Sequence, residues 1–235
     1  SQLYGDDCTA LIVPSQKTKD MLLGYGIKNE MHVIPTGLEL SRFEKSALDP
    51  MKLYDVRKEC GITDDTFTLI FLGRIAPEKS IDLVISSLPK VIETNPNVRL
   101  VIVGGGPGLD DLKDLASRLD LNDHIYFAGP KDSKEVPYYY HACDAFVSAS
   151  ISETQGLTYI EAMAASLPVL ARFDKNLEGI INDTCNGYFF NSQEELFDRV
   201  KPALRSKKKI LSKKGAKQIT ENDIWDFMIN NIWNN

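Results

Sequence analysis

The sequence predicts an α/β protein that is built on a doubly wound parallel sheet and ends in C-terminal helices. Short apolar runs alternate with amphipathic stretches, and this alternation is typical of βαβ units that share a parallel sheet. Residues 68–72 and 98–103 are almost continuously apolar, as expected for strands that helices cover on both faces. Both runs are followed by glycine-containing loops and then by isoleucine, valine or leucine at helical spacing.

The apolar pattern assigns the elements in chain order. Strands are expected at residues 11–14, 68–72, 98–103, 124–128, 144–148, 168–171 and 187–190. Helices are expected at residues 81–88, 109–119, 136–141 and about 156–166, where apolar residues line one face. A last, apolar-aromatic helix is expected at residues 224–233. We expect that helix to pack on another part of the protein, because it carries more apolar surface than a chain end usually exposes.

Composition and charge narrow the functional classes. The 235 residues are 43% hydrophobic and 26% charged, which is typical of a globular protein with a sizeable core. The net charge of -6 argues against nucleic acid as a partner, and no apolar run reaches the length of a membrane span. The cysteines lack paired spacing and the histidines lie far apart, so we expect no metal site and reduced, buried thiols in a cytoplasmic protein. The cysteines are Cys8, Cys60, Cys143 and Cys185.

The loops after the strands carry the chemistry, because ligands of an open parallel sheet bind at the carboxyl ends of its strands. These loops are residues 73–79, 104–107, 129–132 and 150–156. Two of them contain cations, two are rich in glycine, and the loop at 150–156 contains Glu153. This combination indicates a ligand with both phosphate and hydroxyl groups.

The stretch SETQGLTYIE, residues 152–161, makes that ligand more specific. Gly156 lies where the helix expected at about 156–166 begins, and the free N–H groups of a helix N-terminus can hold a phosphate. Glu153 precedes the helix and Glu161 lies roughly 7 Å along it, so a carboxylate flanks each side of the phosphate position. Carboxylates accept hydrogen bonds from hydroxyls, which indicates a diphosphate between two sugars. Arg74 and Lys79 can neutralise that diphosphate and stabilise it as a leaving group.

These motifs resemble those of the retaining GT-B glycosyltransferases of group 1. Glu153 and Glu161 have the spacing of that family's two glutamates. Gly73 and Arg74 with Glu78 and Lys79, the GGGP at 104–107 and the IPTG at 34–37 follow the family's order, and the similarity runs from about residue 8 to about 200. The resemblance implies that the chain is the C-terminal, nucleotide-sugar-binding half of such an enzyme, a Rossmann-like half of the GT-B fold.

The resemblance also implies a role for each matching residue. Glu153, Arg74 and Lys79 are the implied catalytic residues: the two cations bind the donor diphosphate and Glu153 contacts the hexose hydroxyls. Gly156, Leu157 and Thr158 lend backbone N–H groups to phosphate, and Glu161 holds the ribose. The implied donor-binding residues are Gly73, Arg74, Lys79, Gly105, Lys131, Glu153, Gly156, Leu157, Thr158 and Glu161, with Lys131 near the base. Such enzymes retain anomeric configuration and require no metal or other cofactor.

Three regions are expected on the same basis. Residues 1–40 look like the remnant of an N-terminal acceptor domain with its linker, ending a βαβ segment at about residue 36. Residues 41–204 look like the donor-binding domain, and residues 205–235 look like a helical tail that packs back on the N-terminal half. The chain opens abruptly on a strand, so we expect it to be part of a longer protein, and to bind donor without catalysing transfer alone.

The stretch at 152–161, with residues 171–174 and 176–179 after it, more closely resembles the Gram-positive 1,2-diacylglycerol 3-glucosyltransferases. This implies UDP-glucose as donor and diacylglycerol or a glycolipid as acceptor, bound through the missing N-terminal domain. It also implies a cytoplasmic protein in peripheral contact with the inner membrane face. The lysines at 205–217 suit an anionic lipid surface, at about 1 kcal/mol for each cation, although a solvated helix face is the favoured interpretation of that cluster.

Each motif also has a simpler interpretation, and other functions remain open. The glycines at 104–106 can form a mere strand-to-helix turn, and Arg74 and Lys79 can be surface charges. The alternatives are transfer to a cell-wall or polysaccharide acceptor, a non-catalytic nucleotide-sugar-binding module, a dinucleotide-dependent oxidoreductase and a sugar-nucleotide epimerase. Residues 73–78 lack the glycines of the dinucleotide fingerprint, which disfavours the oxidoreductase.

Overall fold

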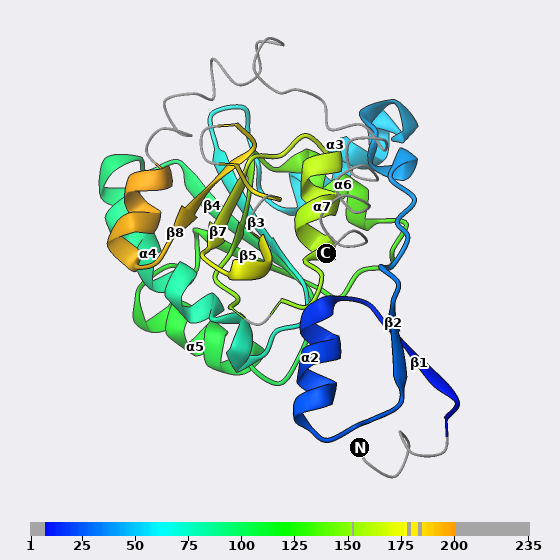
Figure 1. The fold of residues 1–235 in the computed structure, drawn as a ribbon. Helices are drawn as coiled ribbons and strands as arrows, with labels where there is room; N and C mark the ends of the chain where they lie inside the picture. Colours follow the sequence, from blue (N-terminus) through cyan, green and yellow to red (C-terminus); the bar gives the residue numbers. More distant parts are fainter. Residues whose placement is uncertain (1–7, 152, 178–179, 183–184, 201–235) are drawn as a thin grey trace.

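The computed structural model describes residues 8–200, apart from residues 152, 178–179 and 183–184. The described chain forms a two-stranded sheet near its N-terminus and a six-stranded sheet that makes up the body of the molecule. Figure 1 shows the N-terminal strands and their helix projecting from one end of the body. We call residues 10–36 the small unit.

The small unit is a single βαβ motif. β1 (Ala10–Val13) and β2 (Glu30–Val33) pair in parallel, and α2 (Gln16–Gly24) connects them. Ser15 caps α2 because its side-chain oxygen accepts the N–H of Thr18, as serine commonly does at this position. Val13, Ile27 and Met31 form a small buried core under the helix. A βαβ motif is therefore present at this position, and its assignment to an N-terminal acceptor domain stays a prediction.

The body is a parallel sheet whose strands are added in two directions. The strands are β3 (Phe67–Leu72), β4 (Val98–Val103), β5 (Ile125–Gly129), β6 (Ala145–Ser148), β7 (Val169–Arg172) and β8 (Gly187–Phe190). The chain starts in the middle at β3, adds β4 and β5 on one side, and then crosses over to add β6, β7 and β8 on the other. All pairings are parallel. The order therefore reverses between β3 and β6, and such a switch point is where ligands of this architecture bind.

Helices cover both faces of this sheet, which confirms the doubly wound prediction. The helices are α3 (Pro50–Glu59), α4 (Ile81–Thr94), α5 (Leu109–Arg118), α6 (Val136–Ala142) and α7 (Leu157–Ala164). Successive residues of a strand point to opposite faces, so Leu69 and Phe71 join the core under α4 and α5, and Ile70 joins the core under α3, α6 and α7. Figure 1 shows these two groups of helices on opposite sides of the strands.

Most predicted elements lie within two residues of the observed ones, and β4 and β8 occupy the predicted residues. α4 continues past the predicted stretch to Thr94, through Pro89. α3 was not predicted because it buries no residue and has little apolar periodicity; its sequence signal is the cap Asp49 followed by Pro50 at the first helical position. The predicted helix at 224–233 and the lysine cluster at 205–217 lie outside the described residues.

The prediction that the cysteines are buried is correct for two of them and wrong for the other two. Cys60 and Cys143 are buried in the core under α3 and α6, whereas Cys8 and Cys185 are exposed. The exposed pair lies outside the regular elements, before β1 and in the turn before β8, where no core is available to cover a small side chain. In the part of the chain that the structure describes, none of the four forms a disulfide bond. Among the described helices, none combines the length and the hydrophobicity that crossing a bilayer requires.

The loops after β3, β4 and β5 are stacked by direct backbone contact. The N–H groups of Gly73 and Ile75 donate to the carbonyls of Val103 and Gly105, at 3.0 and 2.9 Å. A Cβ on Gly104 would lie 1.9 Å from the Gly73 carbonyl oxygen, and one on Gly106 would lie 2.1 Å from that of Ile75. Gly104 and Gly106 therefore let the second loop support the first, which carries Arg74 and Lys79.

α3 is attached to the body through Glu59 at its C-terminal end. The Glu59 carboxylate accepts hydrogen bonds from the hydroxyl of Tyr126 at 2.8 Å, the ammonium of Lys131 at 3.2 Å and the hydroxyl of Tyr139 at 3.3 Å. Burial acts to raise the pKa of Glu59, but the bonds from Tyr126 and Lys131 hold that pKa below its ordinary value of 4.5. The ionised carboxylate therefore contributes to the stability of this corner of the fold.

The stacking of the loops predicts a contrast between neighbouring glycines. Gly104→Ala should reduce the free energy of unfolding by about 3 kcal/mol, because the new methyl group meets rigid backbone. Gly105→Ala is the matched control, since its Cβ would meet Pro130 Cδ at an ordinary 3.6 Å; we expect a loss below about 1 kcal/mol. Urea unfolding followed by circular dichroism measures both, and equal losses would show that the approach of the two loops is not rigid.

The Glu59 cluster predicts a pH-dependent contribution to stability. Because the folded pKa is lowered, the stabilisation is fully present above pH 4.5 and is lost as the pH falls through the folded pKa. Glu59→Gln should therefore lower the free energy of unfolding at pH 7, by no more than about 1 kcal/mol for a partly exposed group, and the difference from wild type should shrink below pH 4.5. Glu93→Gln, on the exposed surface of α4, is the control. A difference that stays constant down to acid pH contradicts the ionic role.

Candidate functional site

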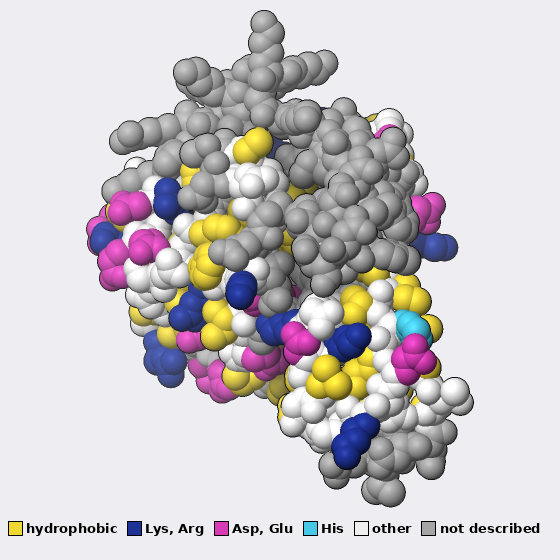
Figure 2. Space-filling model, viewed as in Figure 1, with side chains coloured by type: hydrophobic (Ala, Val, Ile, Leu, Met, Phe, Trp, Pro, Cys, Tyr) yellow, Lys and Arg dark blue, Asp and Glu magenta, His cyan; other side chains and the backbone are white. Residues whose placement is uncertain are grey.

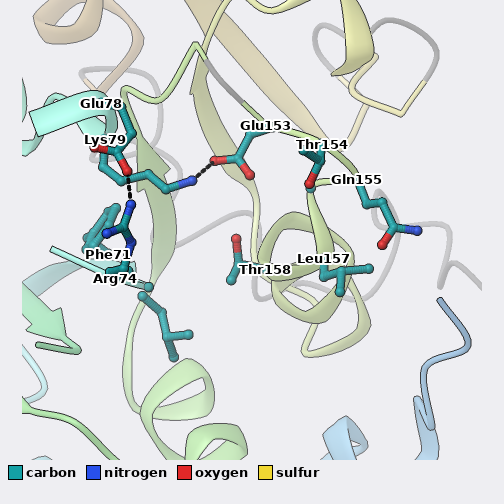
Figure 3. Close-up of a pocket in the computed structure, with 12 residues that line it drawn as sticks. Phe71, Arg74, Glu78, Lys79, Glu153, Thr154, Gln155, Leu157 and Thr158 are labelled. Carbon is teal, nitrogen blue, oxygen red and sulfur yellow. Dashed lines mark hydrogen bonds and ion pairs between the residues drawn. The ribbon is translucent and has the colours of Figure 1, made fainter. Parts of the chain in front are cut away.

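A cavity of about 410 Å³ opens at the switch point between β3 and β6. Its volume lies within the range of small-molecule sites. It is bounded by the loop after β3, the loop after β6 and the first turn of α7. The lining residues are Phe71, Leu72, Gly73, Arg74, Glu78, Lys79, Glu153, Thr154, Gln155, Gly156, Leu157 and Thr158. Figure 3 shows Lys79 and Glu153 reaching toward each other from the two loops, with Arg74 and Glu78 bonded to each other on one side.

Many of the residues singled out in the sequence come together here. Gly73, Arg74 and Lys79 line one wall, and Glu153 with Gly156 lines the other. Leu157 and Thr158 lie beside Gly156 at the start of α7 and also line the cavity. Glu161, Lys131 and Gly105 are not among its lining residues.

Arg74 lies at the open side of the cavity and is paired with Glu78. Glu78 belongs to the short 3-10 helix η3 (Pro77–Lys79), and its carboxylate accepts a hydrogen bond from the Arg74 guanidinium. The two side chains are 64% and 41% exposed. An ion pair this exposed is weak, so the guanidinium can exchange Glu78 for an anionic ligand.

Lys79 and Glu153 form an ion pair across the cavity, from η3 to the loop after β6. The ammonium donates to the Glu153 carboxylate at 2.8 Å, and the side chains are only 21% and 13% exposed. Figure 3 shows the two side chains pointing toward each other above Thr158. The backbone at Ser80 adopts a left-handed turn with φ of 47° that ends η3 and begins α4. That turn fixes the direction in which the Lys79 side chain leaves the main chain, so the fold determines the position of the ammonium group.

The N-terminus of α7 forms the third side of the cavity. Gly156 precedes the helix with φ of 64°, and no side chain caps the first turn. The first N–H groups of an α-helix have no intrahelical acceptor, and here they include those of Leu157 and Thr158. Together with the helix dipole, these groups favour an anion at this position. The cavity therefore combines two cations, a helix N-terminus and two carboxylates, Glu78 and Glu153, each paired with one of the cations.

Glu161 lies further along α7 and faces away from this cavity, toward Arg42 and Tyr140. Its carboxylate lies 3.5 Å from the Arg42 guanidinium and accepts a hydrogen bond from the Tyr140 hydroxyl at 3.2 Å. Burial raises the pKa of Glu161, and Tyr140 and Arg42 oppose that rise. Lys131 donates to Glu59, as described above, and the Gly105 carbonyl accepts the N–H of Ile75. The ligand-binding roles of these three residues remain predictions.

Two charged residues that were not predicted as site residues touch the loop of Glu153. The Asp174 carboxylate accepts the N–H of Glu153 at 3.3 Å, and the Lys17 ammonium donates to the Glu153 carbonyl at 2.9 Å. Asp174 follows β7, so its place at the carboxyl end of a strand was a usable signal. Lys17 lies on α2, far away in sequence, and no local pattern points to it. Across the part of the chain that the structure describes, no three His, Cys, Asp or Glu side chains gather as metal ligands.

Comparison with known proteins identifies a family. Residues 55–222 match the family described as "Glycosyl transferases group 1". The alpha-monoglucosyldiacylglycerol synthase of Streptococcus pneumoniae is 39% identical over 198 residues, which cover 84% of this chain and 45% of that protein. The enzyme of the same name from Acholeplasma laidlawii is 37% identical over 193 residues, covering 82% of this chain and 48% of that protein. The chain thus spans about half the length of these relatives.

Solved structures agree on the architecture. HepE of Anabaena, in its complex with UDP-glucose, superposes with a TM-score of 0.76 at 21% identity, over 94% of this chain and 61% of that one. A glycosyltransferase from Rickettsia africae superposes with a TM-score of 0.74 at 24% identity, over 98% of this chain and 60% of that one. These neighbours are GT-B glycosyltransferases, and at such identities they establish the fold alone. With the family match covering most of the chain, this protein belongs to the group 1 glycosyltransferases.

Proposed function

We propose that this chain is the donor-binding part of a retaining glucosyltransferase that takes UDP-glucose as donor. The observation that carries the proposal is the Lys79–Glu153 ion pair, held at 2.8 Å beside the N-terminus of α7. An anion site alone needs only the cations and the helix. A carboxylate in the same cavity serves a ligand that also carries neutral hydroxyl groups, as a sugar diphosphate does.

In this proposal the diphosphate lies between Arg74, Lys79 and the first turn of α7. The N–H groups of Leu157 and Thr158 bind phosphate oxygens, and the two cations balance their charge. The same contacts strengthen as negative charge develops on the departing nucleoside diphosphate, so they lower the barrier to breaking the glycosidic bond. The weak Arg74–Glu78 pair supports this assignment, because little free energy is lost when Arg74 leaves Glu78 to bind a phosphate.

Glu153 binds the hydroxyl groups of the hexose. Its carboxylate is 13% exposed and already accepts one hydrogen bond from Lys79, whose positive charge offsets the repulsion between that carboxylate and an anionic ligand. A carboxylate has several acceptor positions, and each can take a hydroxyl hydrogen of a sugar. Lys79 therefore serves both ends of the ligand: it meets the diphosphate and orients the carboxylate that holds the sugar.

The nucleoside extends away from the cavity toward Glu161. Glu161 follows Leu157 by four positions in α7, about 6 Å along the axis, and its bonds to Arg42 and Tyr140 support a fixed carboxylate for the ribose. Lys131 and Gly105 are assigned to the region of the base. No metal takes part in this proposal, because Arg74, Lys79 and the helix supply the positive charge that the diphosphate requires.

The acceptor is proposed to be diacylglycerol or a glycolipid. The support is the 39% and 37% identity to two alpha-monoglucosyldiacylglycerol synthases. A cytoplasmic enzyme in peripheral contact with the inner membrane face fits such an acceptor. Other relatives include a D-inositol 3-phosphate glycosyltransferase at 34% identity and GDP-mannose-dependent mannosyltransferases at 30% or below, so a different sugar or a saccharide acceptor is the alternative.

A thermal-shift series on the purified chain tests the donor. UDP-glucose, UDP, GDP-mannose and NAD are compared, each at a concentration far above the expected Kd. A ligand at 100 times its Kd stabilises the folded state by about 2.7 kcal/mol, which is a readable shift. We expect shifts with UDP and UDP-glucose alone. A shift with GDP-mannose in their place would change the proposed donor, and a shift with NAD alone would contradict the site assignment.

The two walls of the cavity should respond differently to mutation. Glu153→Ala should lower the affinity for UDP-glucose by about tenfold to a hundredfold, which corresponds to the loss of hydrogen bonds to a charged group. It should change the affinity for UDP much less. Arg74→Ala should lower the affinity for both ligands, because Arg74 is proposed to bind the diphosphate that they share. Isothermal titration calorimetry measures both affinities, with the exposed residues Glu93→Ala and Arg118→Ala as charge-matched controls. Equal losses for UDP and UDP-glucose in Glu153→Ala would contradict the hexose role.

The chain alone should bind the donor without transferring glucose. Both donor and acceptor must be held together for transfer, and the chain spans about half of its relatives. Incubation with radiolabelled UDP-glucose and diacylglycerol vesicles, followed by lipid extraction, should give no product above the level of an Arg74→Ala, Glu153→Ala double variant. Robust labelling of lipid by the chain alone would contradict this expectation.

A further inference from the structure

The loop that carries Glu153 is held by the small unit at several points. Lys17 donates to the Glu153 carbonyl at 2.9 Å and its ammonium lies 3.7 Å from the Asp174 carboxylate. Gln155 accepts a hydrogen bond from the Thr36 hydroxyl at 2.8 Å and donates to the Pro14 carbonyl at 3.0 Å. These partners are 119 to 141 positions apart along the chain, so the contacts join two separate units of the fold.

The topology explains why these residues meet. Pro14 and Lys17 follow β1 and Thr36 follows β2, so they lie at the carboxyl edge of the small parallel sheet. Residues 153–155 follow β6, at the carboxyl edge of the large sheet. The two carboxyl edges therefore face each other, with the cavity beside their contact. Figure 2 shows basic and acidic side chains side by side where the small unit adjoins the body.

The charges at this contact fix the backbone of Glu153 from both sides. Asp174, whose side chain is 6% exposed, accepts the Glu153 N–H, while Lys17 occupies the Glu153 carbonyl. The Lys17 ammonium also neutralises the Asp174 carboxylate, and a carboxylate that is so deeply buried is costly without a cation. One ion pair thus holds both polar groups of the peptide units around Glu153, while Lys79 holds its side chain.

We propose that Lys17 is a positioning residue for Glu153, reaching across from the small unit to set the carboxylate that binds the sugar. This inference rests on the proposed donor function and adds a residue to it. Lys17 has no place among the residues that line the cavity, so it acts through the main chain of Glu153 and through Asp174. Its removal should loosen the sugar end of the site and leave the diphosphate end, with Arg74 and the first turn of α7, intact.

The expected signature is a change in the ratio of two affinities. Lys17→Met keeps the aliphatic stem and removes the ammonium. It should therefore lower the affinity for UDP-glucose at least about fivefold, in line with the loss of a charged hydrogen bond. The same change should alter UDP affinity by less than about twofold, which is the spread of surface substitutions. Lys19→Met is the matched control, because Lys19 lies on the same helix but donates to the Met31 carbonyl within the small unit. Lys17→Arg should restore most of the UDP-glucose affinity.

Amide hydrogen exchange gives a readout that does not depend on any ligand. In Lys17→Met, peptides covering residues 153–157 should exchange faster than in wild type and in Lys19→Met, while peptides of α5 remain unchanged. Asp174→Asn should give the same pattern, and its effect should not add to that of Lys17→Met because the two groups form one pair. Circular dichroism melting verifies that each variant is folded.

The two proposals can fail separately. If wild type binds neither UDP nor UDP-glucose, the donor function is wrong, and faster exchange at 153–157 in Lys17→Met still supports the positioning contact. If wild type binds both ligands but Lys17→Met matches Lys19→Met in affinity ratio and in exchange, the positioning role is overturned while the donor site stands. Equal losses of UDP and UDP-glucose in Lys17→Met would also overturn it, since the effect would not be confined to the sugar end.

Discussion

The ion pair between Lys79 and Glu153 is the interaction on which the site depends. A carboxylate beside a diphosphate position raises the energy of any anionic ligand unless a cation stands close to it. Here the cation is supplied from the loop after β3 and the carboxylate from the loop after β6, the two central strands on either side of the switch point. The pair therefore needs the parallel order of the sheet, since only that order brings these two loops to the same edge. It also joins the two walls of the cavity, so the geometry of one wall depends on the other.

The rigidity of that arrangement comes from backbone contacts below it. The loop after β3 rests on the loop after β4, where Gly104 and Gly106 allow an approach that a Cβ would prevent. The left-handed turn at Ser80 then directs Lys79 toward Glu153. On the opposite wall, Asp174 holds the Glu153 N–H and the uncapped first turn of α7 follows directly at Gly156. Both walls are thus set by main-chain geometry, which lets the side chains meet a ligand with little rearrangement.

The sequence predicted much of this, because most of it is locally encoded. Apolar runs predicted the strands. The rule that ligands bind at the carboxyl ends of strands predicted one shared site, and its residues Arg74, Lys79, Glu153 and Gly156 line one cavity. What escaped prediction depends on distant pairing. Lys131 was assigned to the base region, yet its ammonium contacts Glu59 on α3, a helix whose sparse apolar pattern concealed it. Lys17 meets Glu153 across 136 positions, and no spacing along one strand or helix encodes such a contact. The glycines at 104–106 have different structural roles. Gly104 and Gly106 permit the close packing of the loops, whereas a Cβ at Gly105 would meet only an ordinary van der Waals contact.

The contacts of the small unit change how the proposed site is understood. If the cavity were complete within the body, the orientation of Glu153 would depend on Lys79 and Asp174 alone. Instead the carbonyl of Glu153 and the side chain of Gln155 are bound by Lys17, Thr36 and Pro14. The diphosphate end of the proposed site is built within the body, whereas its sugar end is shared between the two units. A displacement of the small unit would therefore disturb the main chain of Glu153 directly. If Glu153 binds the sugar as proposed, this arrangement couples the position of the small unit to the orientation of the sugar.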